Sequence, residues 1–213
     1  MSDCLIEEYK IDDTQLVFLK NEPSLDLAKI EFREHELKRL NEFSSEKRKR
    51  EFKGVVCLKN YLFENEEIIY SENGAPRLLY HAEKHISISH SFIYIGMLVA
   101  DFQIGLDIEL ISDKVKRVTS KFINAHEEQH FDLNSAEELT RIWTMKEVLY
   151  KAVSIVGLDY QNHIIISQVN NTYFGCVLLK NQWYVTEFTT FVKDNYIFSF
   201  NKNALVQESN TYL

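Results

Sequence analysis

Residues 103–110 read QIGLDIEL, a short apolar stretch that contains two carboxylates. Successive side chains of a β-strand point to opposite faces, so the stretch divides into two sets. One face carries Ile104, Leu106, Ile108 and Leu110, and the other carries Gly105, Asp107 and Glu109. The pattern predicts a strand that packs its apolar face against a core and gathers its charge on the opposite side.

The charged face of this strand has two interpretations. An unpaired buried carboxylate costs several kcal/mol, so Asp107 and Glu109 need partners if they are buried. Beside Gly105, which has no side chain, they form a site that both a hard cation and a bulky anion could approach. The alternative is an exposed edge strand, on which charges serve solubility. This stretch alone leaves both interpretations open.

A second carboxylate comes from the helix expected at RIWTMKEVLYKAVSIVG, residues 141–157. Trp143, Glu147 and Lys151 are spaced four residues apart and share one helical face with Tyr150. Glu147 and Lys151 alone would be explained by a surface ion pair that contributes about a few tenths of a kcal/mol. Trp143 on the same face favours a side that lines a cleft, because a large aromatic is usually buried.

The segment ISISHS, residues 86–91, adds hydroxyl groups and an imidazole. Alternation places Ser87 and Ser89 on one strand face, and the strand is expected to end at His90 and Ser91. Such groups suit a phosphate, which needs several donors. The alternative for His90 is a solvated ring or a local hydrogen bond.

Composition restricts the class of protein. The chain has 213 residues, 45% of them hydrophobic, and no Ser-, Gly- or Pro-rich linker, which fits one domain or two small halves that share a core. A net charge of -8 argues against general nucleic-acid binding. The longest apolar run, residues 92–100, is far shorter than the roughly 20 residues of a membrane helix, and the start MSDCLIEEYK does not resemble a signal peptide.

The cysteines indicate the compartment. Cys4, Cys57 and Cys176 are odd in number and far apart, which fits reduced thiols better than a disulfide framework. We therefore expect a cytoplasmic protein that binds neither nucleic acid nor a membrane.

The order of patterns predicts an α+β fold of two similar halves, residues 1–101 and 102–213. A capping box at Ser135 starts the long helix, which is expected to stop at Gly157. The expected elements are a hairpin (4–10 and 14–20), helices (24–43, 45–64 and 113–122), strands (86–89, 92–100 and 103–110), the long helix, and a C-terminal meander with turns at Asn170, Asn181 and Asp194.

The order of ISISHS, IGLDIE and WTMKEVLYK resembles the 4′-phosphopantetheinyl transferases, specifically the longer, single-chain class that activates peptide and polyketide synthases. That family carries a Ser-His-Ser segment, a G-x-D-x-E strand and a W-x-x-K-E-x-x-x-K helix. The resemblance covers roughly residues 70 to 160. It implies two pseudo-symmetric α+β halves with coenzyme A bound between them, contacted mainly by the N-terminal half.

The resemblance also implies an activity, which is Mg²⁺-dependent transfer of phosphopantetheine from coenzyme A to a serine of an acyl or peptidyl carrier protein, releasing 3′,5′-ADP. Asp107, Glu109 and Glu147 would hold Mg²⁺, or Mn²⁺ in its place, in the C-terminal half. Glu147 is also a candidate to accept the serine proton, and Lys151 would neutralise the leaving phosphate.

The remaining residues implied by the resemblance would contact coenzyme A. NGAPRL, residues 73–78, stands where the family often has G-K-P, so Ala75 lacks the usual lysine and Arg77 or a helix residue would replace its contact. The family's arginine on the early helix has its nearest counterparts in KRKREFK, residues 47–53, which includes Arg50. The further candidates are Ser89, His90, Lys146 and Lys151.

Three alternatives remain. HEEQH, residues 126–130, matches the HExxH zinc-protease pattern, although its surroundings are polar and KFINAHEE instead resembles a family segment with Glu127. A catalytically silent module that binds coenzyme A or a carrier protein would share the fold without turnover. A metal-dependent phosphoesterase is the enzyme alternative.

One segment is basic in an acidic chain. KVKRVTSK, residues 114–121, has no acidic residue, and as an α-helix it would align Lys114, Arg117 and Lys121 beside an apolar stripe. It is either an ordinary surface helix or the docking site of an acidic carrier protein. We expect the enzyme to be a monomer.

Overall fold

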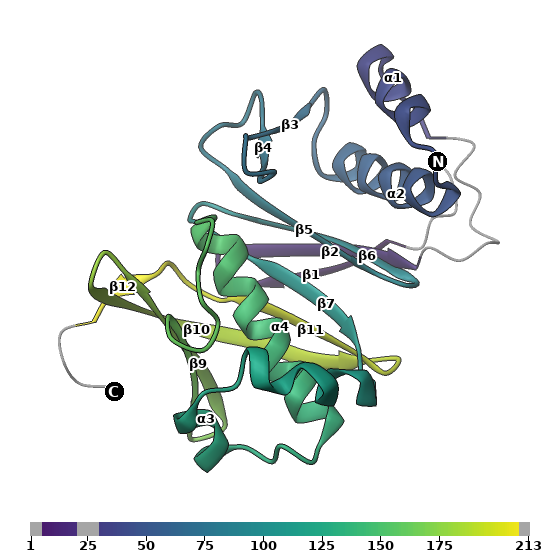
Figure 1. Cartoon of the computed structure of the whole chain (residues 1–213). Coiled ribbons are helices and arrows are strands. Elements are labelled where there is room, and N and C mark those ends of the chain that lie inside the picture. Colours follow the sequence, from purple (N-terminus) through teal and green to yellow (C-terminus); the bar gives the residue numbers. More distant parts are fainter. Residues whose placement is uncertain (1–5, 21–29, 209–213) are drawn as a thin grey trace.

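The computed structural model describes residues 6–20 and 30–208 (Figure 1). Its elements in chain order are β1 (Ile6–Ile11), β2 (Thr14–Lys20), α1 (Glu34–Glu42), α2 (Glu46–Leu62), β3 (Ile68–Tyr70), β4 (Pro76–Leu78), β5 (His85–Ser91), β6 (Tyr94–Ala100), β7 (Leu106–Leu110), the 3₁₀ helix η2 (Asp113–Lys121), α3 (Ala125–His130), α4 (Ala136–Val153), β8 (Ile164–Val169), β9 (Thr172–Leu179), β10 (Gln182–Lys193), β11 (Tyr196–Asn201) and β12 (Val206–Gln207). The mixture of helices and antiparallel sheets confirms the predicted α+β class.

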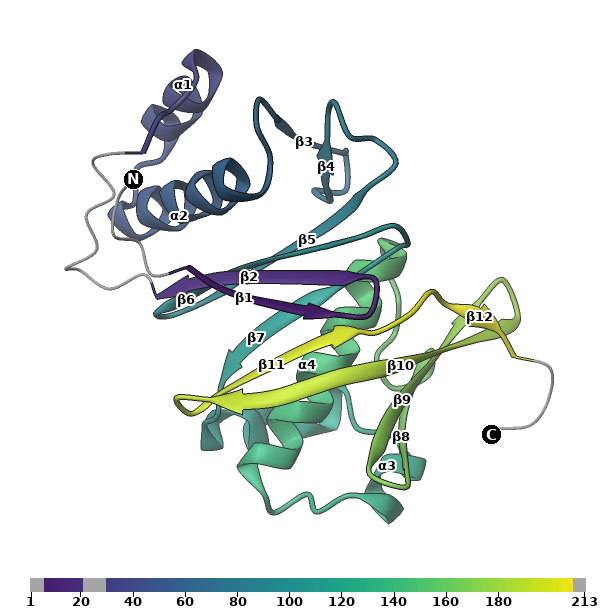
Figure 2. The ribbon, with the colours of Figure 1, turned by 180° about the vertical axis from the view of Figure 1, so that it is seen from behind.

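Two main sheets lie between two long helices in the described part of the chain (Figures 1 and 2). The first sheet has the order β1-β2-β6-β5, and the second has the order β7-β11-β10-β9-β8 with β12 beside β10. Helix α2 packs on β2 and β6, and α4 packs on β7 and β11. The chain therefore changes sheets between β6 and β7. The hairpin of β3 and β4 forms a small separate sheet.

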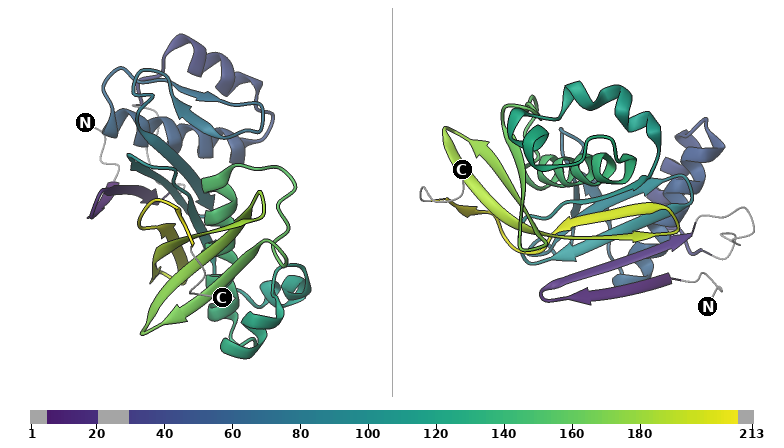
Figure 3. Two further views of the ribbon diagram at one scale, coloured as in Figure 1. Left: turned by 90° about the vertical axis from the view of Figure 1, so that its left-hand side faces the viewer. Right: turned by 90° about the horizontal axis from the view of Figure 1, so that it is seen from below.

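The two sheets face each other (Figure 3). The side chains on their facing sides form one apolar core. The rings of Phe18 and Phe198, one from each sheet, have centroids 4.8 Å apart, and Tyr94 packs edge-on against Phe198. Gly96 permits this close approach, since an added Cβ would lie 2.7 Å from Ile108 Cδ1. The apolar face predicted for residues 103–110 is part of this core, with Ile104, Leu106 and Ile108 all buried.

Several predicted elements differ in extent. The helix expected over 24–43 is helical only at Glu34–Glu42 among the described residues, and its part at 24–29 lies outside them. The segment at 113–122 is a 3₁₀ helix rather than an α-helix. The long helix ends at Val153, four residues before Gly157, because Ser154 adopts a left-handed conformation with φ 52°.

The predicted turns at Asn170, Asn181 and Asp194 are confirmed. Each turn contains two consecutive residues with positive φ, which the tight hairpins between right-handed twisted strands require. Strands β3, β4 and β12 were not predicted, because they are too short to show a period. Among the described helices, none combines the length and apolar composition that crossing a bilayer requires.

Helix α4 lies directly against the start of the second sheet at Gly105. A Cβ added to Gly105 would lie 2.0 Å from the carbonyl oxygen of Val148, a backbone atom that has no room to move. The space left by this glycine is therefore occupied by the helix. This corrects the expectation that the space lets a bulky anion approach Asp107.

The opposite face of α4 contains a buried ion pair. Lys146 is 0% exposed, and its Nζ lies 2.8 Å from Glu127 Oε2 of α3. Glu127 Oε1 also accepts the backbone N–H of Ile166 at 2.9 Å. The pair thus ties α4 to α3 and to β8.

The close approach at Gly105 predicts that Gly105→Ala destabilises the protein by about 1–3 kcal/mol or more, because the helix backbone must move. Urea unfolding measures the loss. Gly54→Ala is the matched control, since its Cβ would meet the end of a side chain, Ile95 Cδ1 at 2.3 Å, rather than backbone, and alanine favours a helix. Equal stability of the two variants would contradict the assigned contact.

The buried pair predicts that Lys146→Met costs about 3–5 kcal/mol, because it leaves Glu127 charged and unpaired in the interior. Thermal and urea unfolding measure this effect. Adding Glu127→Gln should recover part of the loss, since no charge then stays buried. The surface change Lys38→Met serves as control, and a Lys146→Met variant as stable as that control would refute the pairing.

Candidate active site

Serine hydroxyls of β5 connect the first sheet to β7 of the second sheet. Ser87 Oγ accepts the backbone N–H of Leu106 at 2.9 Å, and Ser89 Oγ accepts that of Ile108 at 3.1 Å. Strands β5 and β7 thus run in the same direction. Side-chain hydrogen bonds join them in place of the backbone hydrogen bonds of a regular sheet. Strand alternation places these serines on the face that meets β7.

Two serines of β5, Ser89 and Ser91, contact the two carboxylates of β7. Ser89 Oγ donates a hydrogen bond to Asp107 Oδ1 at 3.0 Å, and Ser91 Oγ donates one to Glu109 Oε2 at 3.3 Å. Ser89 is therefore buried and occupied by protein partners. This corrects its expected role as a phosphate donor, because the hydroxyl proton is already used on Asp107.

Asp107 is only half satisfied. It is 5% exposed, and its Oδ1 also accepts Lys151 Nζ at 2.8 Å. Its Oδ2 is buried and has no hydrogen-bond partner. An unsatisfied buried carboxylate oxygen is costly, so this atom is well suited to accept a positively charged partner.

The neighbouring carboxylates have perturbed pKa values. Burial, and then the charge of Asp107, raise the pKa of Glu109 to about 7. Burial also raises the pKa of Glu147, against the effect of Tyr160, whose Oη donates a hydrogen bond to Glu147 Oε1 at 2.7 Å. Carboxylates that repel one another in a partly dry site are stabilised by a cation.

The three carboxylates fit a hard divalent cation by their donor chemistry. In the part of the chain that the structure describes, no three His, Cys, Asp or Glu side chains already form a group that could hold a metal ion. The buried free Oδ2 of Asp107 and the repulsion among Asp107, Glu109 and Glu147 nevertheless suit Mg²⁺ or Mn²⁺, which prefer oxygen ligands.

Helix α4 presents its polar residues as the spacing predicts. Trp143, Glu147, Tyr150 and Lys151 are partly exposed, whereas the residues between them are buried. Lys151 Nζ donates to the Leu106 carbonyl at 2.8 Å as well as to Asp107. The helix therefore brings Lys151 to the carboxylates of β7.

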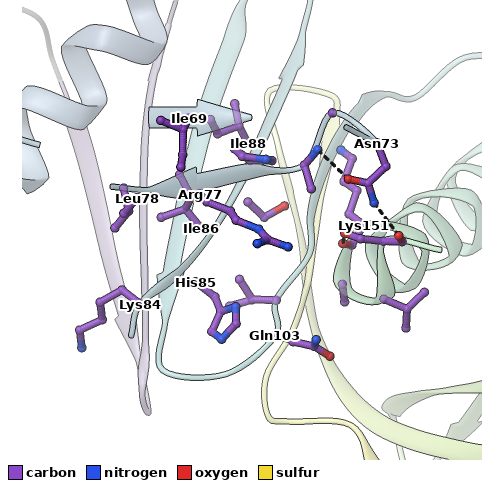
Figure 4. A pocket seen from close by; sticks show the side chains of 18 of the residues that line it. Ile69, Asn73, Arg77, Leu78, Lys84, His85, Ile86, Ile88, Gln103 and Lys151 are labelled. Carbon is purple, nitrogen blue, oxygen red and sulfur yellow. Dashed lines mark hydrogen bonds between the residues drawn. The ribbon is translucent and has the colours of Figure 1, made fainter. Parts of the chain in front are cut away.

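A cavity of about 780 Å³ opens beside Lys151 and is lined by residues of both halves (Figure 4). Arg77 points into it, while Ala75 lines it without a charge. Asn73 Nδ2 donates to the Ser154 carbonyl at 2.7 Å, which connects the β3–β4 turn to the end of α4. The cavity thus has cationic side chains in its lining, and a hydrogen bond joins the β3–β4 turn to α4 at its edge.

Two predicted phosphate contacts, His90 and Arg50, are not among the residues that line this cavity. His90 is on the opposite strand face from Ser89, with its Nδ1 3.5 Å from Glu51 Oε1 of α2. Arg50 lies on the same helix and is not among the residues that line the cavity. Strand alternation places His90 and Ser89 on opposite faces of β5.

Lys146 also requires a correction. Its Nζ donates to the carbonyls of Tyr160 at 2.7 Å and Ile164 at 3.1 Å, in addition to its pairing with Glu127. All of its hydrogen-bonding capacity is used inside the protein. The expected contact with phosphates is therefore wrong.

The HEEQH segment lacks the arrangement of a zinc protease. Glu127, the glutamate that would activate water, is fully buried and paired with Lys146. His126 and His130 are exposed, with stacked rings whose centroids lie 4.2 Å apart. The buried glutamate cannot reach a water bound at these rings.

Two site residues were missed by sequence reasoning. Ser91 as a partner of Glu109 follows from the alternation that pairs Ser87 and Ser89, so a signal was present. Tyr160 lies in the segment after α4 and donates a hydrogen bond to Glu147. No spacing pattern in the sequence predicts this contact.

Comparisons with known proteins indicate which family part of this chain resembles. Residues 103–199 match the family model described as the 4′-phosphopantetheinyl transferase superfamily. The chain is also 26% identical over 111 residues to the 4′-phosphopantetheinyl transferase gsp of Aneurinibacillus migulanus, covering 47% of this chain and 46% of that protein. The chain thus matches less than half of the length of that curated relative. Residues 103–199, which carry the β7 carboxylates and the α4 face, are thus similar to the 4′-phosphopantetheinyl transferase superfamily.

Proposed function

We propose that this protein transfers 4′-phosphopantetheine from coenzyme A to a serine of an acyl or peptidyl carrier protein and releases 3′,5′-ADP. The observation that carries the proposal is the buried, unpartnered Oδ2 of Asp107, which lies among repelling carboxylates. Lys151 connects this group to the cavity, because it both lines the cavity and donates to Asp107. Hence a cation site adjoins a space of the size that a nucleotide needs.

The carboxylates and Lys151 take the following roles. Asp107, Glu109 and Glu147 would hold Mg²⁺, or Mn²⁺ in its place, and the bound ion would offset the charge of the pyrophosphate. Glu147 accepts the proton of the carrier serine directly or through water. Lys151 neutralises the leaving 3′,5′-ADP as the bond from phosphorus to the departing oxygen breaks.

Arg77 is the cation that we assign to a phosphate of coenzyme A. Its side chain points into the cavity, whereas Ala75 in the preceding turn offers no charge (Figure 4). An arginine can donate two parallel hydrogen bonds to a phosphate. We propose that residues 1–101 contact coenzyme A and that residues 102–213 supply the metal site and the carrier-protein surface.

The carrier protein is proposed to dock on η2. Lys114 and Arg117 are exposed and three residues apart, so they share a face of a 3₁₀ helix. Lys116 forms a 2.7 Å ion pair with Asp113, which leaves it less suited to a partner. A basic face on a chain of net charge -8 would attract an acidic carrier protein.

The class, compartment and oligomeric state of the protein are part of the same proposal. We place the protein in the longer, single-chain class and expect a cytoplasmic monomer. Cys57 and Cys176 are buried. The odd number and wide spacing of the three cysteines in the sequence support a reducing compartment.

The metal model predicts that Asp107→Asn lowers the rate of transfer at least about 10²-fold, because a ligand charge is lost while the side-chain shape is kept. The mass of an apo carrier protein after incubation with coenzyme A and Mg²⁺ measures transfer. Stability should change little, since the loss of repulsion offsets the loss of the Lys151 pair. Glu128→Gln, an exposed change of the same type, is the control.

The same measurement separates the alternatives. A gain of one phosphopantetheine group supports transfer, and free 3′,5′-ADP with an unmodified carrier protein supports a phosphoesterase. No reaction by the wild-type protein supports a silent binding module. Full wild-type activity in EDTA would disprove the metal model.

The docking model predicts that Lys114→Glu combined with Arg117→Glu raises KM for the carrier protein and flattens its dependence on salt, because charge complementarity mainly speeds association. Affinity for coenzyme A should stay unchanged. Lys38→Glu with Lys180→Glu changes the net charge equally at distant positions and serves as control. Equal carrier kinetics in both double variants would move the docking surface elsewhere.

A further inference from the structure

Tyr160 is held at both of its ends by consecutive residues of α4. Lys146 Nζ donates to the Tyr160 carbonyl at 2.7 Å, and Tyr160 Oη donates to Glu147 Oε1 at 2.7 Å. Lys146 faces the buried side of the helix, whereas Glu147 faces the carboxylate site. The backbone of Tyr160 is therefore anchored to the interior while its hydroxyl reaches the site.

The ring of Tyr160 lies between two aromatic side chains from the same face of α4. Its centroid is 5.5 Å from that of Trp143, with 23° between the ring planes, and 5.7 Å from that of Tyr150, with 21°. Trp143 precedes Glu147 by one helical turn, and Tyr150 follows it by one. The stack therefore fixes the ring alongside Glu147.

The segment around Tyr160 is itself held in place. Asp159 Oδ1 accepts the backbone N–H groups of Gln161 at 2.8 Å and Asn162 at 3.1 Å. Gln161 Nε2 donates to the Ile123 carbonyl at 2.7 Å. These bonds restrain both the backbone and the ring, so the hydroxyl has one well-defined position.

A hydroxyl in this position determines how Glu147 is presented. An ionised carboxylate only accepts hydrogen bonds, and Tyr160 occupies Oε1. Oε2 therefore has more free lone-pair capacity than Oε1 and is the oxygen better able to bind a cation. Second partners that orient a ligand in this way commonly change metal affinity about 10- to 100-fold when they are removed.

We propose that Tyr160 is the positioning residue of the carboxylate site, which holds Glu147 so that Oε2 is offered to the divalent cation. The inference rests on the proposed function in taking Glu147 as a ligand. It adds a residue outside β5, β7 and α4 to the machinery. It also gives the aromatic stack on α4 a task in the reaction.

The test is Mn²⁺ binding to the purified protein without coenzyme A, measured by titration calorimetry and by the electron paramagnetic resonance signal of free Mn²⁺. Tyr160→Phe keeps the ring and removes the hydroxyl, so its Kd for Mn²⁺ should rise about 10-fold or more. Tyr173→Phe is the matched control. It removes another tyrosine hydroxyl that donates to a glutamate of α4, from Tyr173 to Glu138 at 3.2 Å.

A double-mutant cycle shows whether Tyr160 acts through Glu147. In a Glu147→Gln background, Tyr160→Phe should have no further effect on Mn²⁺ binding. A purely structural role would lower stability and affinity by the same amount in both backgrounds. Equal effects in the two backgrounds would therefore overturn the proposal, even if one variant were less stable.

The outcomes separate this inference from the proposed function. If the wild-type protein binds Mn²⁺ and modifies a carrier protein while Tyr160→Phe binds Mn²⁺ with unchanged Kd, the role of Tyr160 is refuted and the function stands. If the wild-type protein binds no Mn²⁺ and transfers nothing, the proposed function and the role of Tyr160 fail together.

Discussion

The contact between β5 and β7 is the constraint on which the rest of this structure depends. Two separate sheets meet there, and serine hydroxyls satisfy backbone N–H groups that would otherwise be buried without partners. The shared aromatic core around Phe18 and Phe198 holds the sheets at this distance. Because Ser89 reaches Asp107 only in this register, the contact between β5 and β7 also determines where the carboxylates lie.

The contact between β5 and β7 brings the carboxylates of Asp107 and Glu109 together at a cost in stability. Asp107 retains a buried oxygen without a partner, and Lys151 compensates only the other oxygen. The raised pKa of Glu109 has burial as its main cause and the charge of Asp107 as its second. Such uncompensated charge is typical of a site that acts on a ligand, since purely structural carboxylates are usually paired. Glu127, which is buried against Lys146, is an example of the structural kind.

Helix α4 places its structural charge and its site charge on different faces, because neighbouring residues of a helix point in different directions. Lys146 and Glu147 are neighbours in the chain, yet one is enclosed in the interior and the other faces the carboxylate site. Gly105 lets the helix backbone approach β7 closely enough for Lys151 to reach Asp107. Tyr160 then connects both sides, since its carbonyl accepts Lys146 and its hydroxyl donates to Glu147. The fold and the site therefore share the same few contacts.

The sequence by itself determined the strand faces of residues 103–110, the polar face of α4, the meander turns and the α+β class, because these depend on local periodicity and turn chemistry. It also carried the motif order that resembles the 4′-phosphopantetheinyl transferase superfamily. Only the tertiary structure decided what each face meets. In the folded chain Lys146 is buried against Glu127, and Ser89 donates to Asp107. Helix α4 occupies the space beside Gly105, and Tyr160 donates to Glu147. Periodicity specifies the direction of a side chain, whereas its partner comes from another part of the chain.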